Sequence, residues 1–208
     1  LKGAVVKGKF SSNTVYAWLD NKLAPGGYAY LIPIDNEKAN IVIAFPDYYY
    51  QGNIDNLWKN FYENVKNRLN TPLEIISNFQ VKNYIIGICP NAHIANTYFV
   101  GNNFGAIMPF LGFGQFSAIL TGIFSAYDIM GKENYEKQLV PLRKSYLNSL
   151  TLRKFMEMSD NKNLDFLVKK LNKSWGNKIF NSNINYLQII STILKPYVKI
   201  FYSKKQPK

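Results

Sequence analysis

An uncharged, glycine-punctuated stretch constrains the fold of this chain more than any other feature. No Asp, Glu, Lys or Arg lies between Lys82 and Asp128. Within this run, residues 98–126 predict a short apolar strand, a glycine-rich loop, and a helix that begins near Gly112-Phe113-Gly114. Glycine has no Cβ, so such a loop lets backbone N–H groups approach a ligand, and a helix N-terminus adds unpaired donors. The stretch therefore predicts a site for an electron-rich or anionic ring or for a phosphate.

Two simpler interpretations compete with this one. A membrane span needs about 20 apolar residues, but glycines, Pro109 and the polar Asn102, Asn103 and Gln115 interrupt the run. A buried core helix after an ordinary glycine loop stays open as an alternative. The glycine pair is not the dinucleotide-binding fingerprint, because no strand ends directly before it and no acidic residue follows about 20 positions later.

Composition excludes several classes of protein and of site. A chain of 208 residues that is 47% hydrophobic and 15% aromatic is too apolar for disorder and long enough for one domain or two small ones. Its single cysteine, Cys89, excludes an internal disulfide and a cysteine-based zinc site, and its single histidine, His93, excludes a histidine cluster. We therefore predict no metal site. With no signal peptide evident, a cytoplasmic location, at most peripheral to the membrane, is expected.

Positive charge is concentrated at one end of the chain. Residues 131–208 carry a net charge of +11, out of +12 for the whole sequence. Lys169, Lys170, Lys173 and Lys178 cluster around Trp175, and an apolar run over 184–201 is followed by further lysines. Two interpretations stay open, a solvated helical face and peripheral contact with an anionic membrane. Nucleic acid is not expected as a partner, because no recognised module accompanies the charge.

Periodicity predicts an α+β fold. Strands are expected over 5–10, 14–19, 28–33 and 40–45 as an antiparallel meander, with two more over 81–89 and 98–100. Helical spacing predicts a helix over 53–69 with Asn53 as N-cap. Further helices are expected over 115–130, 133–157, 161–174 and 183–202, with kinks or breaks at Pro141 and Pro196. We divide the chain into a sheet part (1–96), a strand–loop–helix segment (97–130) and a basic helical region (131–208).

The middle segment, residues 97–130, contains residues that resemble a motif of a known family. Val100-Gly101-Asn102, Pro109, Gly112-x-Gly114 and the small residues of the following helix resemble the second flavin-binding motif of FAD-dependent oxidoreductases. More narrowly, they are similar to the geranylgeranyl reductase group of aromatic-hydroxylase-like flavoproteins. Upstream, residues 25–33 (PGGYAYLIP), residues 39–43 and Ile88-Cys89-Pro90 also look like that group's signatures. The resemblance covers about residues 1–157, and its motifs occur in the expected order.

The resemblance implies roles for particular residues. Gly101, Asn102, Pro109, Leu111, Gly112, Gly114 and Gln115 would bind FAD, and Tyr28, Tyr30, Ile32 and Pro33 would line a substrate cavity. Tyr28 is the best, though weak, candidate for a catalytic acid; a sheet-packing tyrosine is the competing interpretation. Asn102 stands where the family has aspartate, and it accepts hydrogen bonds without charge assistance.

The resemblance also implies a missing part. The family's N-terminal GxGxxG unit has no match, so the chain looks like the C-terminal half of such an enzyme, whether shortened or a natural stand-alone piece. We expect an oxidoreductase acting on an apolar substrate, such as a prenyl lipid, when the protein is full length, and this half alone to lack FAD and activity. Two alternatives stay open, a degenerate binding module without catalysis and a flavin monooxygenase or halogenase relative.

Overall fold

The computed structural model describes residues 1–82, 84, 86–171 and 186–205, and the predicted lysines Lys173 and Lys178 with Trp175 lie outside them. The chain forms two compact units. One contains Leu1–Tyr84 and the described residues of Met156–Lys178, and the other contains Ile85–Phe155 and the described residues of Ile179–Lys205. The α+β class is confirmed, whereas the three-part division into functional domains stays a prediction.

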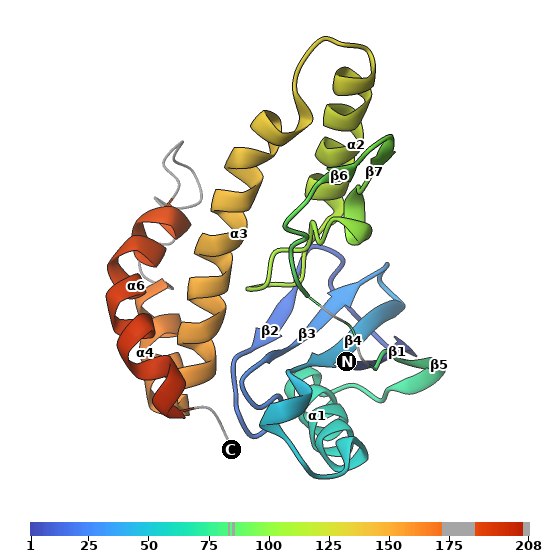
Figure 1. Cartoon of the computed structure of the whole chain (residues 1–208). Coiled ribbons are helices and arrows are strands. Elements are labelled where there is room, and N and C mark those ends of the chain that lie inside the picture. The colour runs from blue at the N-terminus through green and yellow to red at the C-terminus, as the bar shows by residue number, and fades with distance from the viewer. Residues whose placement is uncertain (83, 85, 172–185, 206–208) are drawn as a thin grey trace. The chain divides into compact units, whose positions relative to one another are not determined.

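A five-stranded antiparallel sheet forms the first unit (Figure 1). Its strands are β1 (Lys2–Lys7), β2 (Tyr16–Trp18), β3 (Tyr28–Pro33), β4 (Lys38–Ala44) and β5 (Glu74–Gln80), in the spatial order β2-β3-β4-β1-β5. The predicted meander holds for β2, β3 and β4 but is wrong for β1, which pairs with β4 and β5 instead of β2. Strand β5 closes one edge of the sheet, and β2 forms the other.

The strand predicted over 81–89 is wrong. The chain pairs with β1 earlier, through β5, which is exposed along its whole length although it contains Ile75, Ile76 and Phe79. The described residues of 81–89 form no strand. The backbone of this segment has another use, because the Cys89 N–H donates to the Phe104 carbonyl oxygen at 2.8 Å. Cys89 is accordingly half-buried in a loop and does not end a strand.

Helix α1 (Ile54–Leu69) covers one face of the sheet, and the sequence predicted it well (Figure 1). Asn53 caps it, accepting the Asp55 N–H at 2.8 Å through its side-chain oxygen. The helix ends at Asn70, whose φ of 47° is left-handed. Leu57, Trp58, Phe61 and Val65 of α1 pack with the sheet side chains Ala4, Val6, Ala29, Leu31, Ala39, Ile41 and Ile43 to form the core of this unit.

Two short elements complete the first unit. A 3-10 turn, η1 (Asp47–Tyr49), carries the middle of the Tyr48-Tyr49-Tyr50 run, and the Tyr49 hydroxyl donates to the Glu157 carbonyl oxygen at 2.8 Å. Helix α4 (Asn161–Leu171) begins beside the β2–β3 connection, since the Asn161 amide donates to the Asp20 carboxylate at 2.6 Å. Tyr49 and Tyr50 of this run are half-buried, whereas Tyr48 is exposed.

The second unit is built from a small hairpin, a loop and helices. The hairpin joins β6 (His93–Ile94) to β7 (Thr97–Tyr98), so the strand predicted over 98–100 includes only Tyr98, and His93 lies in a strand instead of a loop. A 3-10 turn, η2 (Gly101–Asn103), leads through the loop into α2 (Gln115–Ile129), followed by α3 (Tyr135–Met158) and α6 (Tyr186–Lys205). Pro141 and Pro196 lie inside α3 and α6, so neither proline breaks a helix, and the alternative of a kink at each stays a prediction. No helix among the described residues has the length and apolar character to cross a membrane.

Candidate functional site

The backbone N–H groups of the glycine loop between η2 and α2 donate hydrogen bonds that hold the loop from its inner side. The Gly101 N–H donates to the Thr121 hydroxyl at 2.9 Å, and the Ala106 N–H donates to the Gly101 carbonyl at 3.0 Å. Further along, the Met108 N–H donates to the Phe113 carbonyl at 2.9 Å, and the Phe110 N–H reaches the Ser149 hydroxyl at 2.9 Å. The cavity beneath the loop measures only about 10 Å³. A ligand would therefore lie on the outer side of the loop.

Gly105 fixes the close approach of the loop to the segment before the hairpin. Its φ is +83°, and a Cβ at this position would lie 1.7 Å from the Gly87 carbonyl oxygen. No L-residue fits there without moving backbone, because the obstructing atom is a carbonyl and not the end of a flexible side chain. The Cys89–Phe104 hydrogen bond lies beside this contact. A glycine is required at this position for packing as well as for conformation.

The N-terminus of α2 is open. Gly114, its N-cap, provides no side-chain hydrogen bond, and no acidic residue occupies the first turn. The Ala118 N–H reaches the Gly114 carbonyl at 2.8 Å, but the N–H groups of Gln115, Phe116 and Ser117 have no partner among the described residues. Gln115 and Phe116 are exposed. These donors and the positive end of the helix dipole favour an acceptor or a partial negative charge.

Helix α2 has an unusual distribution of polarity. Its inward face carries Ser117, Thr121 and Ser125, of which Thr121 is fully buried. Its outward face carries Phe116, Ile119, Ile123 and Tyr127, with Phe116 73% exposed. The short inward side chains allow the loop backbone to approach, and their hydroxyls bond to helix carbonyls, as Thr121 does to Ala118 at 2.9 Å. This support was not predicted, although the spacing of small hydroxyl residues at every fourth position signals it.

The residues predicted to bind a flavin all lie on this loop or at the start of α2. Asn102 and Gln115 are exposed, and the Asn102 side chain has no hydrogen-bond partner among the described residues. Gly112 is also exposed, while Gly101, Leu111 and Gly114 are half-buried. Pro109 is buried. A flavin ring could lie against Pro109, as predicted, only if the surrounding side chains left the edge of the proline ring accessible. The structure thus brings the predicted set into one segment, and its role stays a prediction.

The predicted substrate residues lie on β3 in the other unit. Tyr28 and Tyr30 stack with ring centroids 6.0 Å apart, and Ile32 follows them on the sheet face opposite α1. Pro33 alternates to the other face of the strand. Burial raises the pKa of the Tyr30 phenol above its ordinary value. Because these residues and the glycine loop belong to different units, their meeting at one site stays a prediction.

Arg143 of α3 clamps the segment that precedes the hairpin. Its guanidinium donates to the Cys89 carbonyl at 2.9 Å and to the Pro90 carbonyl at 3.0 Å, and pairs with Glu136 at 3.2 Å. Glu136 in turn accepts the Ala92 N–H at 2.9 Å. The guanidinium also lies 5.0 Å from the centre of the Phe104 ring. This Arg143–Glu136 clamp joins the hairpin segment to the loop, and its partners are too far apart in sequence to be predicted.

A second polar cluster lies at the far end of α2. The Tyr98 hydroxyl donates to the Asp128 carboxylate at 2.5 Å, and the Tyr135 N–H donates to the other carboxylate oxygen at 3.2 Å. The Tyr98 hydrogen bond is the main cause that lowers the pKa of Asp128. His93 stacks on Tyr98 at 5.5 Å, and its Nδ1 is buried without a partner among the described residues. Burial raises the pKa of Tyr135 to about 12, and its hydroxyl donates to the Phe99 carbonyl at 2.7 Å.

Comparison with known proteins gives a fold relationship. No protein-family model matches the chain, and no curated protein matches it. Among solved structures, a geranylgeranyl bacteriochlorophyll reductase-like protein from Thermoplasma acidophilum is similar, with a TM-score of 0.64 and 17% sequence identity. The match covers 97% of this chain and 54% of that protein. The chain therefore has the fold of about half of such a protein, and an identity this low carries the relationship no further than the fold.

Proposed function

We propose that this chain forms the part of a flavin-dependent oxidoreductase that holds the isoalloxazine and ribityl portion of FAD. The observation that carries the proposal is the glycine loop, which is fixed from its inner side, exposed on its outer side, and continued by an uncapped helix. A fold similar to that of a protein described as reductase-like supports the same direction. The loop also matches a flavin chemically, because its unpaired backbone N–H groups can donate hydrogen bonds to the carbonyl oxygens and ring nitrogens of the flavin.

Different residues of the loop would contact different parts of the flavin. Asn102 would approach the ribityl hydroxyls, and Leu111, Gly112 and Gly114 would lie against the pyrimidine end of the ring. The N–H groups of Gln115 and Phe116 would stabilise negative charge on the reduced ring. A bound flavin would supply hydride transfer to or from a carbon–carbon bond, and the chain would position it and exclude water.

We further propose an apolar, prenyl-lipid-like substrate. The support is the apolar face of β3, where the half-buried, stacked rings of Tyr28 and Tyr30 are followed by the exposed Ile32. A surface of aromatic and branched side chains with few charged neighbours suits a long hydrocarbon better than a polar metabolite. Tyr28 is the candidate proton donor among these residues. A binding module that has lost catalysis and a flavin monooxygenase are the competing functions.

We also propose that helix α6 contacts the surface of a membrane peripherally. Its inward side carries Ser191, which bonds to Asn148 of α3 at 3.3 Å, and Val198. Its outward side carries Ile189, Ile193 and Ile200, with Ile193 70% exposed, and Lys195 and Lys199 lie beside this stripe. An apolar stripe flanked by lysines is the pattern of helices that lie in the interface of an anionic bilayer. A substrate that partitions into lipid would be taken up there.

The flavin proposal is tested by titrating the chain with FMN and FAD. The loop offers groups for the ring and ribityl chain only, so both should bind weakly and with similar affinity, and the chain should purify with little or no FAD. Asn102→Asp should strengthen binding several-fold through a charge-assisted hydrogen bond to a ribityl hydroxyl. Asn103→Asp, a change at the adjacent exposed residue of the same turn, is the matched control.

Three results would count against the proposal. One is that neither flavin binds at any concentration tested, and another is that Asn103→Asp changes the affinity as much as Asn102→Asp. The third is that FAD binds far more tightly than FMN, which would place an adenosine site within the chain. Turnover of a prenyl alcohol by the complete protein would then separate an oxidoreductase from a binding module.

A further inference from the structure

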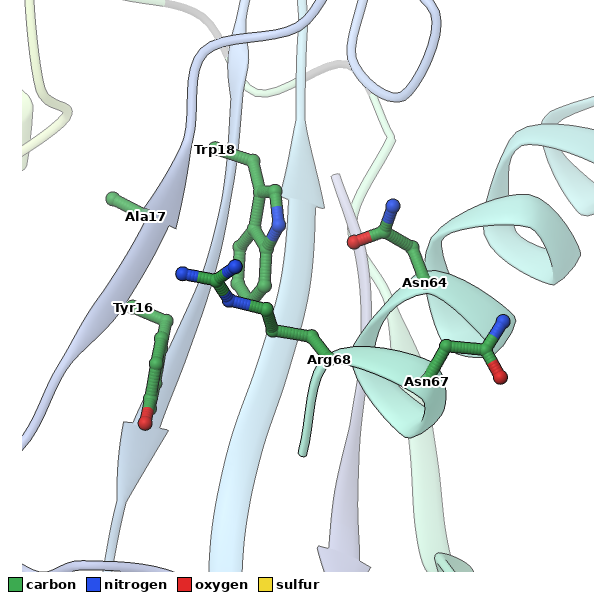
Figure 2. A pocket seen from close by; sticks show the side chains of 6 residues that line it. All are labelled: Tyr16, Ala17, Trp18, Asn64, Asn67 and Arg68. Carbon is green, nitrogen blue, oxygen red and sulfur yellow. The ribbon is translucent and has the colours of Figure 1, made fainter. Parts of the chain in front are cut away.

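An open groove lies between the edge strand β2 and the last turns of α1, within the first unit (Figure 2). Its volume is about 530 Å³, which falls within the range of small-molecule sites. Six residues line it: Tyr16, Ala17, Trp18, Asn64, Asn67 and Arg68. Neither the glycine loop nor the tyrosine face of β3 contributes a residue to this groove.

The aromatic wall of the groove is held in place by the core. Tyr16 and Trp18 alternate with Ala17 on β2, so both rings project from the same face of the sheet. Their centroids lie 6.1 Å apart with an interplanar angle of 27°. Trp18 meets the buried Phe61 edge-on at 5.3 Å, which fixes the indole from behind. Two neighbouring rings of fixed orientation form a platform on which a planar ring can stack.

The opposite wall supplies hydrogen-bonding groups from one face of α1. Asn64, Asn67 and Arg68 are spaced three and four residues apart and are all exposed. Figure 2 shows the Arg68 side chain extending from the helix toward the rings of Tyr16 and Trp18. Arg68 has no carboxylate partner among the described residues, and no acidic residue lines the groove. The groove therefore combines a stacking platform, two carboxamides and an uncompensated guanidinium.

We propose that this groove binds a mononucleotide. The base would stack on Tyr16 and Trp18, the carboxamide of Asn64 would read polar atoms on its edge, and Arg68 would hold the phosphate. Aromatic rings, carboxamides and a guanidinium are the groups that proteins use for these three parts of a nucleotide. An added peptide strand suits the place less well, because β2 has only three residues, and short edge strands resist strand addition.

The test is a titration of the chain with AMP, in which binding is measured by calorimetry and by the quenching of tryptophan fluorescence. AMP should bind, adenosine should bind about tenfold more weakly, and inorganic phosphate should bind more weakly still. Arg68→Gln should reduce the affinity for AMP about tenfold and leave that for adenosine unchanged. Tyr16→Leu keeps an apolar side chain at the edge of the core and should weaken AMP and adenosine alike.

The matched control is Lys66→Gln. Lys66 is an exposed cation in the same turn of α1, but it pairs with Glu63 at 3.6 Å and does not line the groove. It should leave AMP binding unchanged. Failure of AMP to bind, equal binding of AMP and phosphate, or equal effects of Lys66→Gln and Arg68→Gln would each overturn the proposal. Tight binding of a single-stranded oligonucleotide that AMP fails to displace would also overturn it. The Arg68→Gln variant should bind FMN normally, so a measurement of its FMN affinity separates this groove from the glycine loop.

Discussion

Replacing Gly105 by alanine should destabilise the second unit more than the same replacement at Gly101, Gly114 or Gly131. The left-handed conformation of Gly105, with φ of +83°, costs a residue with a Cβ about 1–2 kcal/mol. The new Cβ would lie 1.7 Å from the Gly87 carbonyl oxygen and 2.6 Å from its carbon, so backbone must shift. Overpacking of this kind costs about 1–3 kcal/mol more. Together these effects predict a loss of about 2–5 kcal/mol, a large share of the stability of a typical domain.

Two other glycines separate the effects. Gly131 has a φ of +66°, but a Cβ added there would meet no heavy atom within 4 Å, so Gly131→Ala should cost only the conformational part, about 1–2 kcal/mol. Gly122 lies inside α2 with open space around it, and Gly122→Ala should stabilise the helix by about 0.5–1 kcal/mol.

The measurement is urea unfolding followed by far-UV circular dichroism, together with hydrogen exchange of the amides near Gly87 and Gly105. Exchange is needed because Trp18 and Trp58 both lie in the first unit, so their fluorescence reports that unit. Gly105→Ala should speed exchange at the Cys89 N–H, which donates to Phe104. If Gly105→Ala destabilises the protein no more than Gly131→Ala, the close contact with Gly87 has no energetic weight and the reasoning fails.

Three further predictions test the support of the loop, a titrating group and the basic helix. Arg143→Met should remove hydrogen bonds to Cys89 and Pro90 and cost about 2–4 kcal/mol in urea unfolding, whereas Lys144→Met, its exposed neighbour on α3, should cost less than about 0.5 kcal/mol. The lowered pKa of Asp128 adds stability that is present above pH 3.8 and is lost as pH falls through its folded pKa, so the stability gap between wild type and Asp128→Asn should close on acidification. The protein should sediment with anionic liposomes at low salt and be released as salt rises, and Lys195→Gln with Lys199→Gln should weaken this by about 2 kcal/mol where Lys59→Gln does not. Equal binding to neutral and anionic liposomes would leave the basic surface as a solvated face.

Elements set by local signals were predicted well from the sequence. The N-cap Asn53 and the apolar spacing over 54–69 act within a few residues, so both ends of α1 were located closely. Strand β3 was also located correctly, because its alternation of buried Ala29 and Leu31 with tyrosines is local. Strand β5 was missed because its order comes from pairing with β1, more than 65 positions away, and not from its own residues. The position of β1 beside β4 has the same non-local origin.

The candidate site shows the same division. The need for glycine in the loop and the open start of α2 were visible in the sequence, since both depend on residues within the loop itself. The groups that hold the loop were not visible. Thr121 lies 20 positions from Gly101, Ser149 lies 39 from Phe110, and Arg143 lies 54 from Cys89. Such contacts follow from how helices pack, which a single sequence does not specify.

The absence of charge around the loop and the polarity of α2 have one explanation. No charged side chain lies between Lys82 and Asp128, so within this segment only backbone dipoles contribute to the field, above all the open N-terminus of α2, while Arg143 of α3 adds a guanidinium 5.0 Å from the Phe104 ring. Backbone donors act at close range only, so the loop must be held rigidly, and the buried Thr121 hydroxyl and the small side chains beside it allow that. If this loop holds a flavin, as we propose, its backbone donors would contribute to stabilising the reduced, anionic form.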